Sequence, residues 1–284
     1  MQQTLQEVLK NDYVARAREL AAEIASAKPD LVGLQEVTIW SLPTAGGAVT
    51  IDQLQLLLQA LASEQETPYA VVAVNTLTNI GFPIPDAGVA QFTDRDVVIR
   101  RVGSPVTTSN SSSHSYAQLV TLPPDISVKR GWISVDATVG ARTFEFVTTH
   151  LESSAGLYGN PQVDLVQAAQ AQQLAVMFAD KSVPVVIAGD FNSNATHTPP
   201  EQTQAFKIML GTGYVDAWSA LHHGNPGFTW PLYLEDPLVD HTQGPLERID
   251  FVFSKDAYPT SVTRTGLQRP FGSDHAGVLA TFDF

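Results

Sequence analysis

The chain has 284 residues, is 44% hydrophobic and carries a formal net charge of −13 without a single cysteine. The absence of cysteine excludes disulfides, thiolate metal sites and a cysteine nucleophile. The acidic residues are spread along the chain and Lys and Arg do not cluster, which argues against tight, non-specific binding to duplex DNA.

The composition is that of a globular protein with enough apolar material for a sizeable core. No linker or internal repeat divides the chain, so we expect one domain over residues 1–284. No apolar run approaches the roughly 18 residues that cross a bilayer, and the first residues do not resemble a signal peptide. We therefore expect a soluble protein, either cytoplasmic or secreted after removal of a signal; the oligomeric state stays open.

The predicted elements begin with an amphipathic helix over 12–27, which Pro29 ends. A short buried strand over 30–36, a second helix over 51–64 and a strand over 69–75 follow. The stretch 76–93 is rich in turn residues and is predicted to be a long loop, as are 41–50, 104–115 and 222–245. The remaining predictions are a helix over 161–179 and strands over 96–101, 116–122, 131–138, 143–150, 183–188, 248–254 and 277–282.

Several consecutive strands stand between helices in this order. That pattern indicates an α/β protein in which sheets pack on each other with helices outside, rather than a regular βαβ alternation.

Polar clusters lie at the edges of the predicted apolar strands, where loops bring distant segments together. The five clusters are Gln35-Glu36, residues 149–152, residues 189–192, residues 248–251 and residues 273–275.

Asp190 and Asn192 are two residues apart on an extended segment, so a carboxylate and an amide would share one pocket with Phe191 behind them. An Asx turn is the alternative interpretation. Glu36 ends a buried strand, where a carboxylate is costly unless it is paired or metal-bound; an isolated surface Glu is the alternative.

His275 follows Asp274 before the last strand, and it could bind metal or donate to a phosphate. Asp250 is a candidate to hold an imidazole in one tautomer. His150 taken alone is typical of a core histidine, and a salt bridge or loop polar group is the alternative for each of the others.

The clusters together supply carboxylates, an amide and two histidines. The sequence has no serine-nucleophile motif and no Gly-rich phosphate loop. This combination favours metal-assisted phosphoryl chemistry.

The five clusters in this order resemble the motifs of the endonuclease/exonuclease/phosphatase superfamily, and Gly189-Asp190-Phe191-Asn192 with Ser273-Asp274-His275 are the most specific of them. The resemblance implies a four-layered α/β sandwich, DNase I-like, with the site at one edge of its two packed mixed β-sheets. It implies Mg²⁺ or Mn²⁺ held by Glu36 and Asp274. Catalytic roles fall to His150, Asp190, Asn192, Asp250 and His275: Asp190 activates water, Asn192 and His150 contact the phosphate, and Asp250 supports His275.

One departure from the family pattern concerns the first strand, which normally ends in an Asn near the metal. Here the chain opens almost directly into a helix, and Asn11 is interpreted as a helix cap. We expect one sheet edge without a partner and a weakened metal site.

The leading hypothesis is a phosphodiesterase or phosphatase for a small or lipid-like phosphoester. A nuclease, or a catalytically impaired relative that binds a phosphorylated ligand or a protein, is the alternative. Phe228, Trp230 and Tyr233 are candidates to line a pocket.

Overall fold

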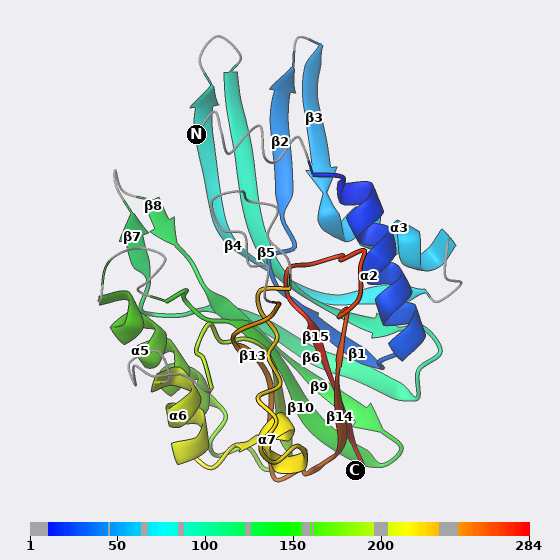
Figure 1. The fold of residues 1–284 in the computed structure, drawn as a ribbon, viewed down its shortest axis with the longest axis vertical. Coiled ribbons are helices and arrows are strands. Elements are labelled where there is room, and N and C mark those ends of the chain that lie inside the picture. The colour runs from blue at the N-terminus through cyan, green and yellow to red at the C-terminus, as the bar shows by residue number, and fades with distance from the viewer. Residues whose placement is uncertain are drawn as a thin grey trace.

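The computed structural model describes residues 11–44, 46–63, 68–84, 88–122, 126–154, 160, 162–195, 204–232 and 244–284. Within these residues two β-sheets pack face to face, and helices cover the outer face of each sheet (Figure 1). The order of layers is therefore helix, sheet, sheet, helix. This arrangement confirms the predicted four-layered α/β sandwich.

The first sheet is antiparallel throughout, and its strands follow the order β1-β5-β2-β3 with β4 on the other side of β5. Two helices, α2 (Tyr13–Ala27) and α3 (Gln53–Ser63), cover its outer face through Ala21, Ile24 and Leu61. The strands are β1 (Leu31–Leu34), β2 (Ile39–Thr44), β3 (Gly47–Asp52), β4 (Tyr69–Ile84) and β5 (Gly88–Arg101).

The second sheet has the order β12-β13-β11-β10-β9-β6, and β10 and β11 are its one parallel pair among the described strands. Helices α5 (Gln162–Met177) and α6 (Gln204–Gly211) pack on its outer face. The strands are β6 (Val106–Ser115), β9 (Gly131–Val139), β10 (Arg142–His150), β11 (Val185–Asp190), β12 (Val215–Asp216) and β13 (Asp250–Lys255). Smaller elements are α7 (Ala217–Leu221) and the pairs β7 (Val120–Leu122) with β8 (Ile126–Val128) and β14 (Pro259–Thr265) with β15 (Gly277–Phe282).

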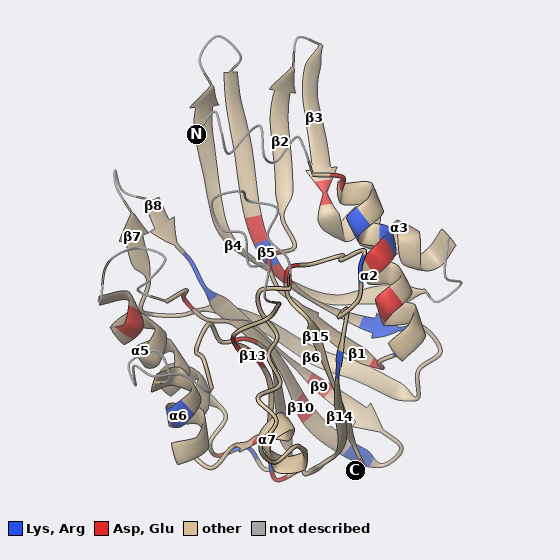
Figure 2. Cartoon of the chain, viewed as in Figure 1, with Lys and Arg blue, Asp and Glu red and all other residues tan. Residues whose placement is uncertain are grey.

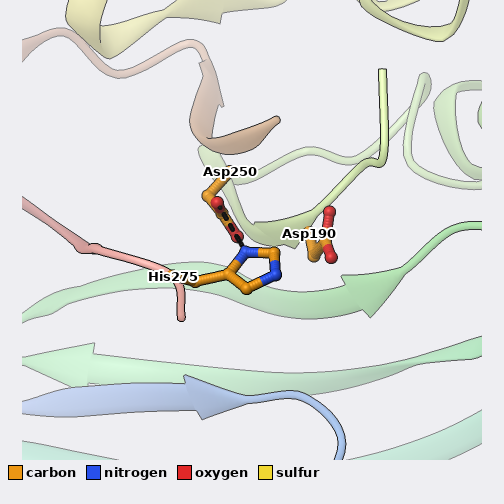
Figure 3. Close-up of side chains that lie close together, drawn as sticks. All are labelled: Asp190, Asp250 and His275. Carbon is orange, nitrogen blue, oxygen red and sulfur yellow. Dashed lines mark hydrogen bonds and ion pairs between the residues drawn. The ribbon is translucent and has the colours of Figure 1, made fainter. Parts of the chain in front are cut away.

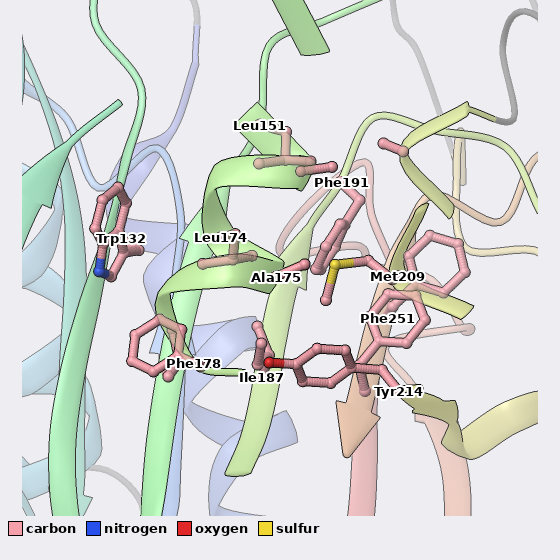
Figure 4. Close-up of a cluster of buried hydrophobic side chains, with 14 of the residues drawn as sticks. Trp132, Leu151, Leu174, Ala175, Phe178, Ile187, Phe191, Met209, Tyr214 and Phe251 are labelled. Carbon is pink, nitrogen blue, oxygen red and sulfur yellow. The ribbon is translucent and has the colours of Figure 1, made fainter. Parts of the chain in front are cut away.

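The core lies in three apolar layers. Between the sheets, Val98 of the first packs with Ile133 and Val135 of the second. Under α5 and α6, fully buried side chains such as Leu174, Ile187 and Phe191 fill the space between helices and sheet (Figure 4). Burial of each such side chain is worth about 1.5–3 kcal/mol, so these layers hold the strand ends of the second sheet in a fixed place.

Three predicted loops are wrong. Residues 41–50 form most of the β2–β3 hairpin, 76–93 form the long β4–β5 hairpin on either side of residues 85–87, and 104–115 contain β6. Their Gly, Pro and Asn content resembles turn chemistry. Yet Pro83 lies on the edge strand β4 and Pro43 lies beyond the residues of β2 that pair with β5, where no ladder hydrogen bond is lost. Conversely, of the predicted strand 116–122 only β7 is extended and paired.

Helix α2 is capped by Asp12, whose side chain accepts a hydrogen bond from the backbone N–H of Ala15. The predicted cap, Asn11, is wrong by one residue. Among the described strands, β1 pairs only with β5 and β15 pairs only with β14, so each has one edge without a described partner. No helix in the described part of the chain is long and apolar enough to span a membrane.

Candidate active site

Three polar residues lie in one row across the second sheet. The register pairs His150 of β10 with Asp190 of β11, and Asp190 with Asp250 of β13. Neighbours in register project to the same face, so one histidine and two carboxylates meet at the strand ends. Gly189 permits this close packing, because a Cβ there would lie 2.0 Å from the carbonyl oxygen of Thr149.

A second histidine completes this group from the loop before β15. Ligand atoms of Asp190, Asp250 and His275 all lie within 4.8 Å of one another (Figure 3). The Nδ1 atom of His275 lies 3.0 Å from the Oδ2 atom of Asp250. Burial acts to lower the pKa of His275, but the charge and hydrogen bond of Asp250 outweigh it and raise the pKa well above its ordinary value. His275 is therefore a cation that donates to Asp250.

Asp190 lies in a crowded, water-poor place. Burial, and then the negative charge of Asp250, raise its pKa to about 8. The backbone N–H of Asn192 donates to its Oδ1 atom at 2.7 Å and opposes this rise. At neutral pH such a carboxyl group holds its proton in most molecules, so a bound cation that lowered its pKa would prepare Asp190 to act as a general base.

Asn192 adopts a left-handed backbone conformation with φ of 50°, which Asn tolerates better than most residues. This turn brings its side-chain nitrogen to 3.1 Å from the Nε2 atom of His150. Phe191, between the two polar residues, is fully buried and packs edge-on against Phe253. The segment is therefore not extended through Asn192: β11 ends at Asp190, whose side chain accepts from the N–H two residues on, which is the Asx turn of the alternative interpretation, and Phe191 packs into the core behind it.

His150 is fixed by Arg130, whose Nη1 atom donates to its Nδ1 atom at 2.8 Å. Burial and then the charge of Arg130 lower the pKa of His150 well below its ordinary value, so the ring is neutral. A guanidinium and an amide nitrogen only donate, so Arg130 and Asn192 place one donor beside each ring nitrogen of His150. The Nε2 atom lies 3.5 Å from the Oδ2 atom of Asp190 and faces the site.

The two predicted metal ligands, Glu36 and Asp274, do not belong to the group in Figure 3. The Oε1 atom of Glu36 lies 3.9 Å from Nη1 of Arg130, and 66% of its side chain is exposed. The Oδ2 atom of Asp274 accepts from the indole N–H of Trp230 at 3.3 Å. Glu36 is nevertheless near enough for its charge to raise the pKa of Asp190.

Buried charges behind the site were not predicted from the sequence. Arg130 lies within 4 Å of carboxylate oxygens of Glu36, Asp94 and Glu152, and so links the two sheets. Asp96, fully buried, has no hydrogen-bond partner for either carboxylate oxygen among the described residues. The sequence did contain a signal for them. Arg130 directly precedes an apolar strand and Asp96 lies within one, and a charge in such a place is costly unless it is paired.

Trp230 was predicted as a possible pocket residue, and its ring centroid lies 6.2 Å from that of His275. The backbone carbonyl oxygen of Phe228 accepts a hydrogen bond from the side chain of Arg264. Tyr233 lies outside the described residues.

The carboxylates of this site are oxygen donors that fit a divalent cation. Burial, and then Asp94, raise the pKa of Asp96 well above its ordinary value, and Glu36 contributes to the same rise. Repulsion among Glu36, Asp94, Asp96, Asp190 and Asp250 is the kind that a hard cation with oxygen ligands relieves. His275 is less suited as a ligand, because a protonated imidazole has no lone pair to offer.

Comparisons with known proteins found solved structures with a similar fold. In solved structures the chain is similar to an endonuclease/exonuclease/phosphatase family protein from Leptotrichia buccalis C-1013-b, with a TM-score of 0.64, 18% identity and coverage of 97% of this chain and 96% of that one. It is also similar to D. rerio TDP2 complexed with a single-strand DNA product (TM-score 0.61, 17% identity, 97% and 94% covered). A third is the Bacteroides thetaiotaomicron VPI-5482 mannosyl-6-phosphatase Bt3783 (0.56, 16%, 96% and 92%).

A search of curated proteins found no match. The likeness to solved structures shows the fold, and a family model described as Endonuclease/Exonuclease/phosphatase family matches residues 8–275, nearly the whole chain. The chain belongs to the endonuclease/exonuclease/phosphatase family.

Proposed function

We propose that this protein is a phosphoester hydrolase that depends on Mg²⁺ or Mn²⁺ and acts on a small or lipid-like phosphoester. The observation that carries the proposal is a carboxyl with a raised pKa, Asp190, within 4.8 Å of a protonated imidazole, His275, which Asp250 holds in place. A base and an acid within 4.8 Å suit the attack of water on a phosphorus centre.

In this proposal Asp190 orients the attacking water and accepts its proton. His275 donates hydrogen bonds to phosphoryl oxygens, whose negative charge grows in the transition state, and His150 contacts the phosphate through Nε2. Asp250 keeps His275 charged and oriented, and Asn192 orients Asp190 through its backbone N–H. Arg130 holds the ring of His150 in place.

Glu36 and Asp274 would hold the cation, as the family resemblance implies, and the Asp190–Asp250 side of the site adjoins it. The cation, when bound, supplies charge neutralisation for the phosphate. The alternative set for the cation is Asp190, Asp250 and His275. In that alternative His275 would have to release a ring proton when the ion binds.

The formal net charge of −13 favours a small or lipid-like substrate. Long duplex DNA is disfavoured because it binds to clusters of Lys and Arg. A nuclease remains the second candidate because one of the similar structures, TDP2, was solved with a single-strand DNA product.

The test is hydrolysis of bis-p-nitrophenyl phosphate with Mg²⁺, with Mn²⁺ and with EDTA. We expect metal-dependent turnover that falls at least a hundredfold in Asp190→Ala and Glu36→Ala. Asp283→Asn, at an exposed position outside the site, is the matched control and should keep full activity.

Absence of turnover with every metal, by protein whose circular dichroism shows it folded, would overturn the proposal in favour of an impaired, ligand-binding relative. A parallel assay with p-nitrophenyl phosphate and with single-stranded DNA distinguishes phosphatase, diesterase and nuclease.

A further inference from the structure

Two hairpins extend the first sheet beyond the sandwich. Strands β2 and β3 and the distal parts of β4 (residues 79–84) and β5 (residues 88–93) form a four-stranded sheet, in the order β4-β5-β2-β3, which we call the arm. In Figure 1 the arm projects from the rest of the molecule, with β3 and β4 as its outer strands.

Beyond Asp52, where β3 joins the rest of the molecule, the described part of the arm carries no charge. In the sequence, residues 37–51 and 67–93 contain a single charged residue, Asp86, which lies outside the described residues, although 16% of the whole chain is charged. Figure 2 shows this contrast: the described strands of the arm are tan, and red and blue appear only where the arm joins the rest of the molecule. A projecting sheet in water normally carries charges, particularly Lys, on its outer strands.

One face of the arm is apolar along its length. The register aligns Ile80, Phe92, Trp40 and Ile51 in one row across the four strands, and Phe82 and Leu42 lie in the next row. Trp40 and Phe92 are in contact, with ring centroids 4.7 Å apart. Tyr13 packs against this face, on which Leu42 and Ala90 are buried, while Val49, beside Leu42, is 50% exposed.

Near its end the arm is apolar on the opposite face as well. There the register pairs Pro83 with Val89, and Pro43 with Ala48. Val89 is 51% exposed, and Pro83 and Ala48 are exposed too. The end of the arm therefore exposes apolar side chains on both faces, Val49 on the first and Val89 on the second.

The apolar face leads into the candidate active site. Side chains alternate along β5, so Ala90 and Phe92 share the face of Asp94, which lies 3.8 Å from Arg130. Strand β2 begins at Ile39, three residues after Glu36. A phosphoester whose apolar part lay along the arm would have its phosphate near the site.

We infer that the arm docks into a neutral, zwitterionic lipid surface and so brings the site to phosphoesters held in that surface. This inference rests on the proposed function and names its substrate class. An anionic surface is disfavoured, because the arm has no Lys or Arg and the chain carries −13. A second copy of the chain, paired along β3 or β4, is the competing occupant.

The experiment measures co-sedimentation of the full chain with vesicles of phosphatidylcholine, alone or with 30% phosphatidylserine as a probe of charge, in about 0.15 M salt. The variant is Val49→Asp/Val89→Asp, which places two charges at exposed positions of the arm. Val102→Asp is the matched control, since Val102 is equally exposed (51%) and follows the opposite end of β5.

We expect the wild type and Val102→Asp to bind phosphatidylcholine and the double variant to bind at least tenfold more weakly. Tighter binding to the anionic vesicles, no binding to either, or equal binding of the double variant would overturn the inference. A dimer in solution that the double variant dissociates would assign the arm to a second copy instead.

Turnover of bis-p-nitrophenyl phosphate separates this inference from the proposed function. All three proteins should hydrolyse this soluble diester equally, while only the wild type and the control should act faster on a phosphodiester in phosphatidylcholine vesicles. Vesicle binding without turnover of either substrate would refute the hydrolase and leave the docking surface intact.

Discussion

Replacing Asp190 by Asn should stabilise the metal-free protein while removing its activity. The pKa of Asp190 is raised from 3.8 to about 8 by burial and by Asp250, so the folded state binds a proton that the unfolded chain releases above pH 4. Folding usually lowers the pKa of a carboxyl group. Here folding raises it, so the free energy of unfolding falls as the pH rises from about 4 to about 8. Asn keeps the acceptor for the N–H of Asn192 and carries no charge.

The linkage relation gives the size of this effect. With a pKa of 3.8 in the unfolded chain and about 8 in the folded state, the carboxyl group lowers the free energy of unfolding by about 2 kcal/mol at pH 5 and about 4 kcal/mol at pH 7. We take these as upper limits and expect Asp190→Asn to gain more than about 1 kcal/mol at pH 7, with a smaller gain at pH 5.

Urea denaturation in EDTA at both pH values, with Asp283→Asn as the control, measures the difference. A variant less stable than the wild type, or a gain that does not change with pH, would refute the electrostatic account of the site.

Three further predictions follow from the same contacts. Mg²⁺ at a hundredfold excess over Kd should stabilise the wild type by about 2.7 kcal/mol and so raise its melting temperature. The rise should be smaller in Glu36→Gln. Equal rises in both proteins would show that Glu36 does not bind the metal. Arg130→Gln should cost about 3–5 kcal/mol in urea denaturation because buried carboxylates lose their cation, and a loss below about 1 kcal/mol would contradict this. Gly33→Ala should cost about 1–3 kcal/mol, since its Cβ would lie 2.1 Å from Oγ1 of Thr148; the cost should shrink in a Thr148→Ala background, and an unchanged cost would place the strain elsewhere.

The elements with clear periodicity were predictable from the sequence. The helical stripe over 12–27 became α2, and the apolar runs near 131–138 and 143–150 became β9 and β10. The arm was not predictable by turn-residue content, because Gly81 and Pro83 resemble loop residues. Their alternation with Ile80, Phe82 and Ile84 indicates a half-buried strand once an adjacent strand supplies the pairing.

The site was predictable to the extent that it depends on strand ends. Asp190, Asp250 and His150 lie in register because β10, β11 and β13 are neighbours, and motifs at the ends of apolar runs were enough to select them. Which carboxylates share a cation is a different problem, because it depends on the rotamers of Glu36 and Asp274 in loops, on which apolar periodicity carries no information.

Arg130 shows why the remainder needed three dimensions. Its partners Glu36, Asp94 and Glu152 come from different segments of the chain, and two of them belong to the other sheet. The sequence presents Arg130 only as one half of a dibasic pair before a strand. Buried between the sheets, it is the counter-ion of these carboxylates and the donor that holds the ring of His150. A cation that organises acidic ligands also limits how much negative charge is left for a metal. Metal affinity in this protein should therefore depend on Arg130 as strongly as on the ligands themselves, although Arg130 cannot bind the ion.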